Sequence, residues 1–197
     1  MLLTFIIIPN FFDNPELIYD LAIKQKYYTL DKHPNDSTRP LELFYNGTKT
    51  LPLKNLLSES EYTSIGNMCL SKIIKQTIKP NMSVEFNANY TCHFASLMET
   101  DISEPKLVHT DSTLLSGFVY LQKEKPKFPF MHGTSVIVNG KPVQIEYEYN
   151  TCVLFRSDLI HIPNHGFGNT LETSRLTFNL FINSIDISIK NKLFGMK

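Results

Sequence analysis

Apolar residues in the first part of the chain recur at helical spacing. After Asn14-Pro15, a pair typical of a helix start, an apolar stripe follows in Leu17, Ile18, Leu21 and Ala22. A second helix is predicted to begin after Ser58, because Ser58 and Glu61 form a capping box, and to end before Pro80. Between the two helices, residues 32–53 are rich in turn-forming residues, which predicts a loop with short strands.

From residue 84 onward the helical period gives way to the alternation of strands. Within residues 84–97, one face is shared by Phe86, Ala88, Tyr90, Cys92 and Phe94. Asn139-Gly140 is a strong signal for a type I′ hairpin. Further strand-like runs are predicted at 117–121, 134–138, 143–149, 151–155 and 176–182. Many short strands after two helices predict a mainly β fold, an antiparallel sandwich or barrel with helices packed on one side.

The composition fits one globular domain. The chain has 197 residues and a mass of 22.7 kDa, with 42% hydrophobic and 19% charged residues. This balance can fill a core and excludes wholesale disorder. No boundary splits off a second domain, so we expect residues 1–197 to form a single domain. Its helix-and-strand part would span 1–80 and its β core about 84–183.

Charge and targeting signals exclude several classes of partner. Nineteen Lys and Arg residues balance nineteen Asp and Glu residues, so no global field attracts nucleic acid or an anionic membrane. The apolar run at residues 2–8 lacks the basic flank of a secretion signal and stops far short of the roughly 20 residues of a membrane span. A buried strand and a cytoplasmic protein are expected. The irregular spacing of the three cysteines predicts reduced thiols at Cys69, Cys92 and Cys152.

Candidate chemistry begins at His109 and Asp111, which stand two residues apart. On an extended segment they point to the same face, and one metal ion can sit between the imidazole and the carboxylate. A hydrogen-bonded surface pair explains this short pattern as well. A later histidine, His161, follows a predicted strand, while Arg175 and Thr177 share one face of an otherwise apolar strand. A guanidinium in an apolar interior is costly unless an anion meets it.

The order of these residues resembles that of a known enzyme superfamily. His-x-Asp, a histidine fifty residues later and Arg-x-Thr after a further fourteen residues are similar to the iron(II)- and 2-oxoglutarate-dependent oxygenases. The similarity is closest to the small prolyl-4-hydroxylase-like branch, with its phage and bacterial members. It is strongest over residues 87–182, in the short motifs Asn87–Tyr90, His109–Ser112, Gly117–Leu121, Gly133–Ser135 and Arg175–Thr177.

The resemblance implies a double-stranded β-helix, or jelly roll, with about two supporting α-helices. It also implies that His109, Asp111 and His161 bind Fe(II), and two imidazoles with one carboxylate suit that ion while leaving positions open for 2-oxoglutarate and O2. Arg175 would hold the far carboxylate of 2-oxoglutarate through its guanidinium fork. Thr177 takes the place of the serine in the family's Arg-x-Ser pair and keeps its hydroxyl.

Two assignments stay open in the sequence. His165 lies four residues after His161, although the family's His-x-Pro followed by Phe-Gly favours His161 as the distal ligand. Tyr90 is either a further donor to the 2-oxoglutarate carboxylate or a core tyrosine with a satisfied hydroxyl. The remaining histidines are expected to be structural or exposed: His33, His93 and His132.

The activity implied by the resemblance is hydroxylation of a peptide or small-molecule substrate, with release of succinate and CO2. Residues 123–132 carry three lysines and are expected to form either a flap over the iron or a solvated loop. Two alternatives remain, a non-catalytic jelly-roll binding module and a cupin-like metal enzyme that does not use 2-oxoglutarate. Arg175 argues against the second, since those reactions need no clamp for a distant carboxylate.

Overall fold

The computed structural model describes residues 4–29, 32, 47–77, 83–101 and 108–190. Within these residues the fold is mainly β, with two α-helices, α1 (Pro15–Ile23) and α2 (Glu59–Thr77). Three short 3-10 helices are η3 (Leu53–Asn55), η5 (Pro129–His132) and η6 (Leu171–Thr173). The strands are β1 (Phe5–Ile8), β2 (Tyr28–Thr29), β3 (Thr48–Lys49), β4 (Ser83–Leu97), β5 (Leu115–Tyr120), β6 (Thr134–Val138), β7 (Lys141–Ile145), β8 (Cys152–Arg156), β9 (His161–Pro163) and β10 (Arg175–Lys190).

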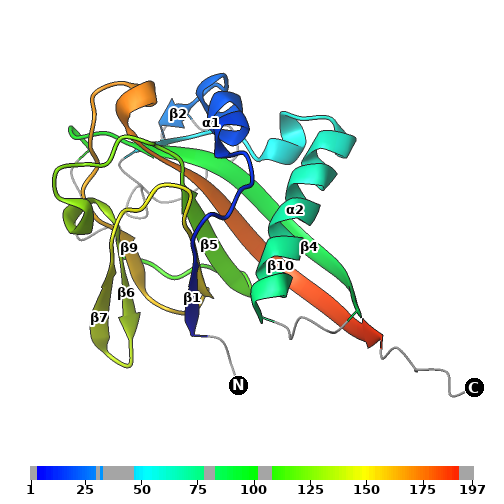
Figure 1. The fold of residues 1–197 in the computed structure, drawn as a ribbon. Coiled ribbons are helices and arrows are strands. Elements are labelled where there is room, and N and C mark those ends of the chain that lie inside the picture. Colours follow the sequence, from blue (N-terminus) through cyan, green and yellow to red (C-terminus); the bar gives the residue numbers. More distant parts are fainter. Residues whose placement is uncertain (1–3, 30–31, 33–46, 78–82, 102–107, 191–197) are drawn as a thin grey trace, which may run out of the picture.

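The strands form two antiparallel sheets that the chain visits in turn. The larger sheet has the order β1-β8-β5-β10-β4-β3-β2 and the smaller one β7-β6-β9 (Figure 1). An isolated bridge between His109 and His161 adds the segment at residue 109 to the edge of the smaller sheet, beside β9. From β4 to β10 the chain therefore alternates between the sheets, apart from the β6–β7 hairpin, which stays within the smaller sheet. This alternation is the double-stranded β-helix, and the fold class predicted from the sequence is confirmed.

The two faces of the larger sheet contribute to different hydrophobic cores, because side chains alternate between the faces along each strand. One set of side chains faces the helices, including Phe94 of β4 and Phe178 of β10, whose rings meet edge to face at 5.8 Å. Figure 1 shows α2 crossing β4 and β10, with β6 and β7 at the opposite side of the picture. We call this side of the sheet the outer core. The opposite set, which faces the smaller sheet, forms the inner core with Phe118, Tyr120, Val136, Ile145, Tyr147, Val153 and Phe155.

The helix starts agree with their sequence signals, with one correction. Helix α1 begins at Pro15, and Ile18 and Ala22 are buried as predicted, but Leu17 is exposed. The apolar stripe is therefore narrower than expected. At α2 the capping box is present: the Ser58 amide donates to Glu61 Oε2 at 2.9 Å, and the Glu61 amide donates to Ser58 Oγ at 3.4 Å. The predicted end at Pro80 lies outside the described residues.

All three cysteines are free and buried in the outer core. Burial raises the pKa of the Cys92 thiol to about 12 and also raises the pKa values of the Cys69 and Cys152 thiols. These thiols behave as small apolar residues, as the sequence predicted. Within the described residues, no helix combines the length and the apolar character needed to cross a membrane.

Candidate active site

His109, Asp111 and His161 come together at the edge of the smaller sheet. The bridge that joins them is antiparallel: the His109 amide donates to the His161 carbonyl at 3.2 Å, and the His161 amide donates to the His109 carbonyl at 3.0 Å. This pairing sets the two imidazole rings side by side, with centroids 4.3 Å apart. One ligand atom from each of the three residues lies within 4.8 Å of the other two. The backbone pairing thus helps to bring together three side chains that could bind one metal ion.

The hydrogen bond made by His161 Nδ1 leaves the other ring nitrogen, Nε2, facing Asp111. His161 Nδ1 lies 3.0 Å from the Leu159 carbonyl, which can only accept, so Nδ1 carries the proton and the Nε2 lone pair is free. That Nε2 lies 3.5 Å from Asp111 Oδ2, and His109 Nε2 lies 3.6 Å from Oδ1. Both distances are longer than ordinary hydrogen bonds. A hydrogen-bonded surface pair therefore explains the cluster poorly, whereas a cation between these atoms explains it well.

The charge state of His161 also suits metal binding. Burial lowers the pKa of His161, and the neighbouring His109 lowers it further. The imidazole is therefore neutral at neutral pH, and neutral imidazole is the form that binds a metal ion. The side chain of His161 is only 9% exposed, whereas that of His109 is 40% exposed. The cluster is accordingly closed on the β9 side and open on the side of His109.

Arg175 is a buried cation with neutral partners. Only 3% exposed, it donates from Nε to the His132 carbonyl at 2.7 Å and from Nη2 to the Gly133 carbonyl at 3.0 Å. Nη2 also donates to Thr134 Oγ1 at 2.9 Å. Among the described residues, no carboxylate forms an ion pair with this guanidinium. A buried positive charge without a counterion is the arrangement expected where an anionic ligand is to bind.

The hydroxyl group that contacts Arg175 is that of Thr134, whereas the hydroxyl expected from the sequence was that of Thr177. Thr177 lies on the same face of β10, but its hydroxyl donates to the Ala95 carbonyl at 3.3 Å. Thr134 Oγ1 meets the guanidinium instead and lies 3.1 Å from the Tyr120 hydroxyl. The Tyr120 ring centroid is 5.3 Å from Arg175 Cζ. Neither Tyr120 nor Thr134 was proposed from the sequence as a site residue, although both stand in the motifs that carry the family resemblance.

Tyr90 is a correction to the predicted site. It pairs with Ile182 across the β4–β10 ladder and therefore faces the outer core, on the opposite side of the sheet from Arg175. Its ring stacks on Tyr62 of α2 with centroids 5.2 Å apart, and its hydroxyl donates to the Tyr62 carbonyl at 3.4 Å. The prediction of a role in binding 2-oxoglutarate is wrong, and the alternative of a core tyrosine describes it.

The other histidines lie outside the ligand cluster. His165 is exposed, and its carbonyl lies 3.1 Å from Nδ1 of His132. His132 is also the residue whose carbonyl accepts from Arg175, so it serves the structure of this region. His93 stacks on Phe181 with ring centroids 5.5 Å apart. His33 lies outside the described residues.

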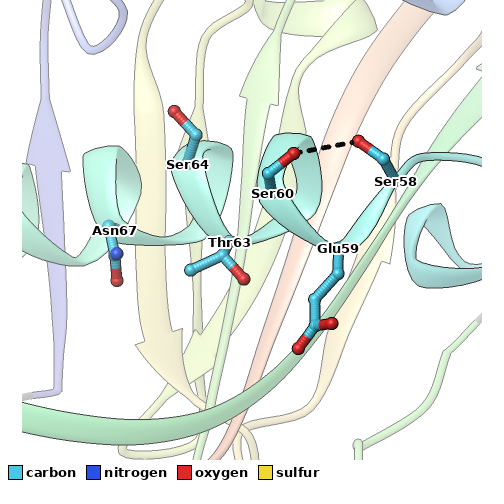
Figure 2. Close-up of a pocket in the computed structure, with 6 residues that line it drawn as sticks. All are labelled: Ser58, Glu59, Ser60, Thr63, Ser64 and Asn67. Carbon is cyan, nitrogen blue, oxygen red and sulfur yellow. Dashed lines mark hydrogen bonds between the residues drawn. The ribbon is translucent and has the colours of Figure 1, made fainter.

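The lysine-rich segment at 123–132 is partly neutralised by glutamates. Lys125 lies 2.8 Å from Glu148, and Lys123 lies 3.8 Å from Glu16. These exposed pairs support a solvated loop more than an anion-binding flap. A shallow hollow elsewhere, on the exposed side of α2, is lined by Ser58, Glu59, Ser60, Thr63, Ser64 and Asn67 (Figure 2). It belongs to the outer side of the larger sheet and contains no member of the His–Asp–His cluster.

Comparisons with known proteins find relatives in structure only. Neither a family model nor a curated protein matches the chain. A Pseudomonas putida prolyl-4-hydroxylase matches with 16% identity and a TM-score of 0.54, covering 91% of both chains. A 2OG-Fe(II) oxygenase family oxidoreductase from Burkholderia pseudomallei matches with 11% identity and a TM-score of 0.62, over 91% of this chain and 84% of the other.

A third similar structure is a prolyl hydroxylase from Trichoplax adhaerens in complex with a peptide fragment of the hypoxia inducible factor oxygen degradation domain. It has 14% identity and a TM-score of 0.59, over 91% of this chain and 83% of the other. At such low identities the likeness establishes the fold alone. The chain has the double-stranded β-helix found in 2-oxoglutarate- and iron-dependent oxygenases, prolyl hydroxylases among them, as the sequence resemblance implied.

Proposed function

We propose that the chain is an iron(II)- and 2-oxoglutarate-dependent oxygenase that hydroxylates a peptide or small-molecule substrate. The observation that carries this proposal is the convergence of His109, Asp111 and His161, whose ligand atoms lie within 4.8 Å of one another in a jelly roll. Two neutral imidazoles and one carboxylate are the ligand set of iron oxygenases that leave positions open for a cosubstrate. The structural neighbours support the same class.

The proposed site has two parts: a metal end, where Fe(II) would bind, and an anion end, where the distal carboxylate of 2-oxoglutarate would bind. His109, Asp111 and His161 would hold Fe(II), which when bound supplies the oxidation that couples hydroxylation of a substrate C–H bond by O2 to conversion of 2-oxoglutarate into succinate and CO2. Arg175 would hold the distal carboxylate of 2-oxoglutarate, because its buried guanidinium has only neutral partners among the described residues.

Three side chains around Arg175 would complete the anion end. Thr134 and Tyr120 form a hydrogen-bonded pair next to the guanidinium, and Thr177 lines the same face of the sheet. In this position Thr134 and Tyr120 can orient the guanidinium and donate to a carboxylate. A cupin-like metal enzyme without 2-oxoglutarate would not require this second, cationic end, so Arg175 favours the oxygenase.

The substrate is proposed to approach from the side of His109, the most exposed of the three ligands. The Trichoplax neighbour is a complex with a peptide, which supports a peptide among the candidate substrates. The free, buried state of Cys69, Cys92 and Cys152 is compatible with the reducing cytoplasm expected from the sequence.

Anaerobic titration with Fe(II) and 2-oxoglutarate tests the proposal. Chelation of Fe(II) by 2-oxoglutarate should give a weak visible charge-transfer band, and admission of air should yield succinate even without the substrate. The His109→Ala variant is expected to give neither signal. A non-catalytic binding module predicts no band in the wild-type protein, and a cupin-like enzyme predicts metal binding without dependence on 2-oxoglutarate.

A further inference from the structure

Three hydroxyl groups form a hydrogen-bonded chain that ends on Asp111. Ser116 Oγ donates to Asp111 Oδ2 at 2.6 Å. Ser157 Oγ lies 2.8 Å from Ser116 Oγ, and Thr113 Oγ1 lies 2.8 Å from Ser157 Oγ. Ser116 and Ser157 are only 2% and 1% exposed, so water does not compete for these bonds. We call these three residues the hydroxyl chain.

One proton in the hydroxyl chain has a fixed direction. A carboxylate only accepts, and a hydroxyl has a single proton, so the proton of Ser116 goes to Asp111. Ser116 Oγ can then only accept from its two hydroxyl neighbours, Ser157 Oγ at 2.8 Å and Thr113 Oγ1 at 3.3 Å. Thr113 Oγ1 also lies 3.3 Å from the Leu115 carbonyl, which can accept its proton. A bond that Ser116 accepts strengthens the one that it donates to the carboxylate.

The fold places the hydroxyl chain through strand register. Ser116 lies in β5 opposite Phe155 of β8, so its side chain belongs to the inner face of the larger sheet. Ser157 directly follows β8, and its carbonyl accepts from the Asp111 amide at 2.9 Å. The side chain of Asp111 is thus fixed to β5, and its main chain is fixed to the residue that follows β8. This attachment joins the larger sheet to the segment that pairs with β9.

We infer that Ser116 is a positioning residue of the metal centre, supported by Ser157 and Thr113. The inference rests on the proposed function and deepens it. The hydroxyl chain engages Oδ2 of Asp111, and within the described residues no hydroxyl donates to Oδ1, which lies 3.6 Å from His109 Nε2. Ser116 thereby fixes the rotation of the carboxylate, with Oδ1 toward His109 and Oδ2 toward His161. Outer partners of this kind orient a ligand before the metal arrives.

The test is calorimetric titration of Co(II) into the metal-free, full-length protein. Ser116→Ala is expected to weaken Co(II) affinity by roughly 10–100-fold, the usual loss for an outer partner of a metal ligand. Ser157→Ala should weaken it less, and Thr113→Val least, because Ser157 contacts Ser116 at 2.8 Å and Thr113 only at 3.3 Å. The visible spectrum of bound Co(II) should also change in Ser116→Ala, since the carboxylate regains rotational freedom.

Ser96→Ala is the matched control. Ser96 is 1% exposed and donates to Ser174 Oγ at 2.7 Å, so its loss removes the same kind of buried bond away from the cluster. We expect it to lower the denaturation midpoint of the metal-free protein about as much as Ser116→Ala, but to leave Co(II) affinity and spectrum unchanged. This comparison separates positioning from general stability.

The outcomes distinguish this inference from the proposed function. Wild-type protein that binds no Co(II) would overturn both. Wild-type binding with the same affinity and spectrum in Ser116→Ala would overturn the positioning role alone. If Ser116→Ala does not fold, Ser157→Ala and Thr113→Val decide the matter: a graded loss of affinity supports the role, and unchanged affinity in both refutes it.

Discussion

His161 and His165 stand four residues apart, yet their surroundings give them different chemistry. His161 is held by a hydrogen bond from Nδ1 to the Leu159 carbonyl and faces Asp111, whereas His165 is exposed. We expect His161→Ala to weaken Co(II) binding by more than the roughly 10–100-fold of an outer partner, because a direct ligand is lost. His165→Ala should bind Co(II) like the wild type. The reverse pattern in a titration would exchange the two assignments.

Arg175 is predicted to act on 2-oxoglutarate and not on the metal. Arg175→Ala should raise the apparent KM for 2-oxoglutarate strongly, since loss of one partner of a buried charge pair costs about 2–5 kcal/mol. Arg175→Lys should recover only part of the affinity, because an ammonium lacks the planar fork. Uncoupled succinate production measures both variants.

Co(II) affinity is the control for the two Arg175 variants. Because the guanidinium bonds the His132 and Gly133 carbonyls, its removal also loosens that loop. A normal Co(II) affinity would show that the metal cluster survives this loss. An unchanged KM for 2-oxoglutarate in Arg175→Ala would remove the residue from the proposed role.

At the residue scale, the sequence identifies candidate site residues better than it predicts which residues they contact. Linear order was enough to name His109, Asp111 and His161, because that order carries the family resemblance. The face of Tyr90 was not readable, because alternation groups Tyr90 with Cys92 and Phe94 but does not say whether that face meets the helices or the site. Thr134 escaped notice for a related reason: its contact with Arg175 depends on how β6 in one sheet meets β10 in the other.

The close approach of α2 to β4 depends on one glycine. A Cβ atom at Gly66 would lie only 1.8 Å from the Tyr90 hydroxyl oxygen and 1.9 Å from Cζ. Gly66→Ala would force Tyr90 away from Tyr62 and break their stacked contact. We expect overpacking alone to lower the unfolding free energy by about 1–3 kcal/mol. This loss should outweigh the favourable helix propensity of alanine, about 1 kcal/mol.

Asn67→Ala controls for helix propensity alone. Asn67 is the next residue of α2 and is exposed, so alanine there should stabilise slightly. Removing the obstructing ring in Gly66→Ala/Tyr90→Ala should make the glycine change nearly harmless relative to Tyr90→Ala. Denaturant unfolding measures all four variants. Equal stability of Gly66→Ala and the wild type would mean that the helix and strand can separate without cost.

At the scale of elements, the sequence pattern predicts the presence of a strand better than the residue at which it ends. Residues 176–182 were predicted from alternation, but β10 continues to Lys190 beside β4. A register shift between Ile182 and Ser184 changes the phase of the alternation, which resumes at Ile185, so a reading in one phase stops at residue 182 although the hydrogen-bonded ladder continues. The hairpin was read correctly, because Asn139 and Gly140 have the positive φ values of 51° and 73° that its turn requires.

Across the whole molecule, the proposed metal would join segments far apart in the chain. Asp111 is attached to β5 and β8 of the larger sheet, whereas His161 belongs to β9 of the smaller one. Mn(II) at 100 times its Kd should therefore stabilise the fold by about 2.7 kcal/mol. For a chain of this size that corresponds to a rise in Tm of roughly 5–11 °C, measured by calorimetry.

Asp111→Ala should abolish this rise in Tm. The variant removes the carboxylate that both histidines face, so Mn(II) would lose its shared ligand set. An equal rise in the variant would indicate that Mn(II) binds elsewhere.

The three buried cysteines can report on opening of the outer core. Cys69 comes from α2, Cys92 from β4 and Cys152 from β8, and all three lie in the outer core, away from the candidate metal ligands. Because only a thiolate reacts with a disulfide reagent, their raised pKa values and burial protect them while the fold is closed. The rate of thiol labelling would then measure how often the helical layer lifts from the sheet, without any introduced probe and without interference from ions at the other face.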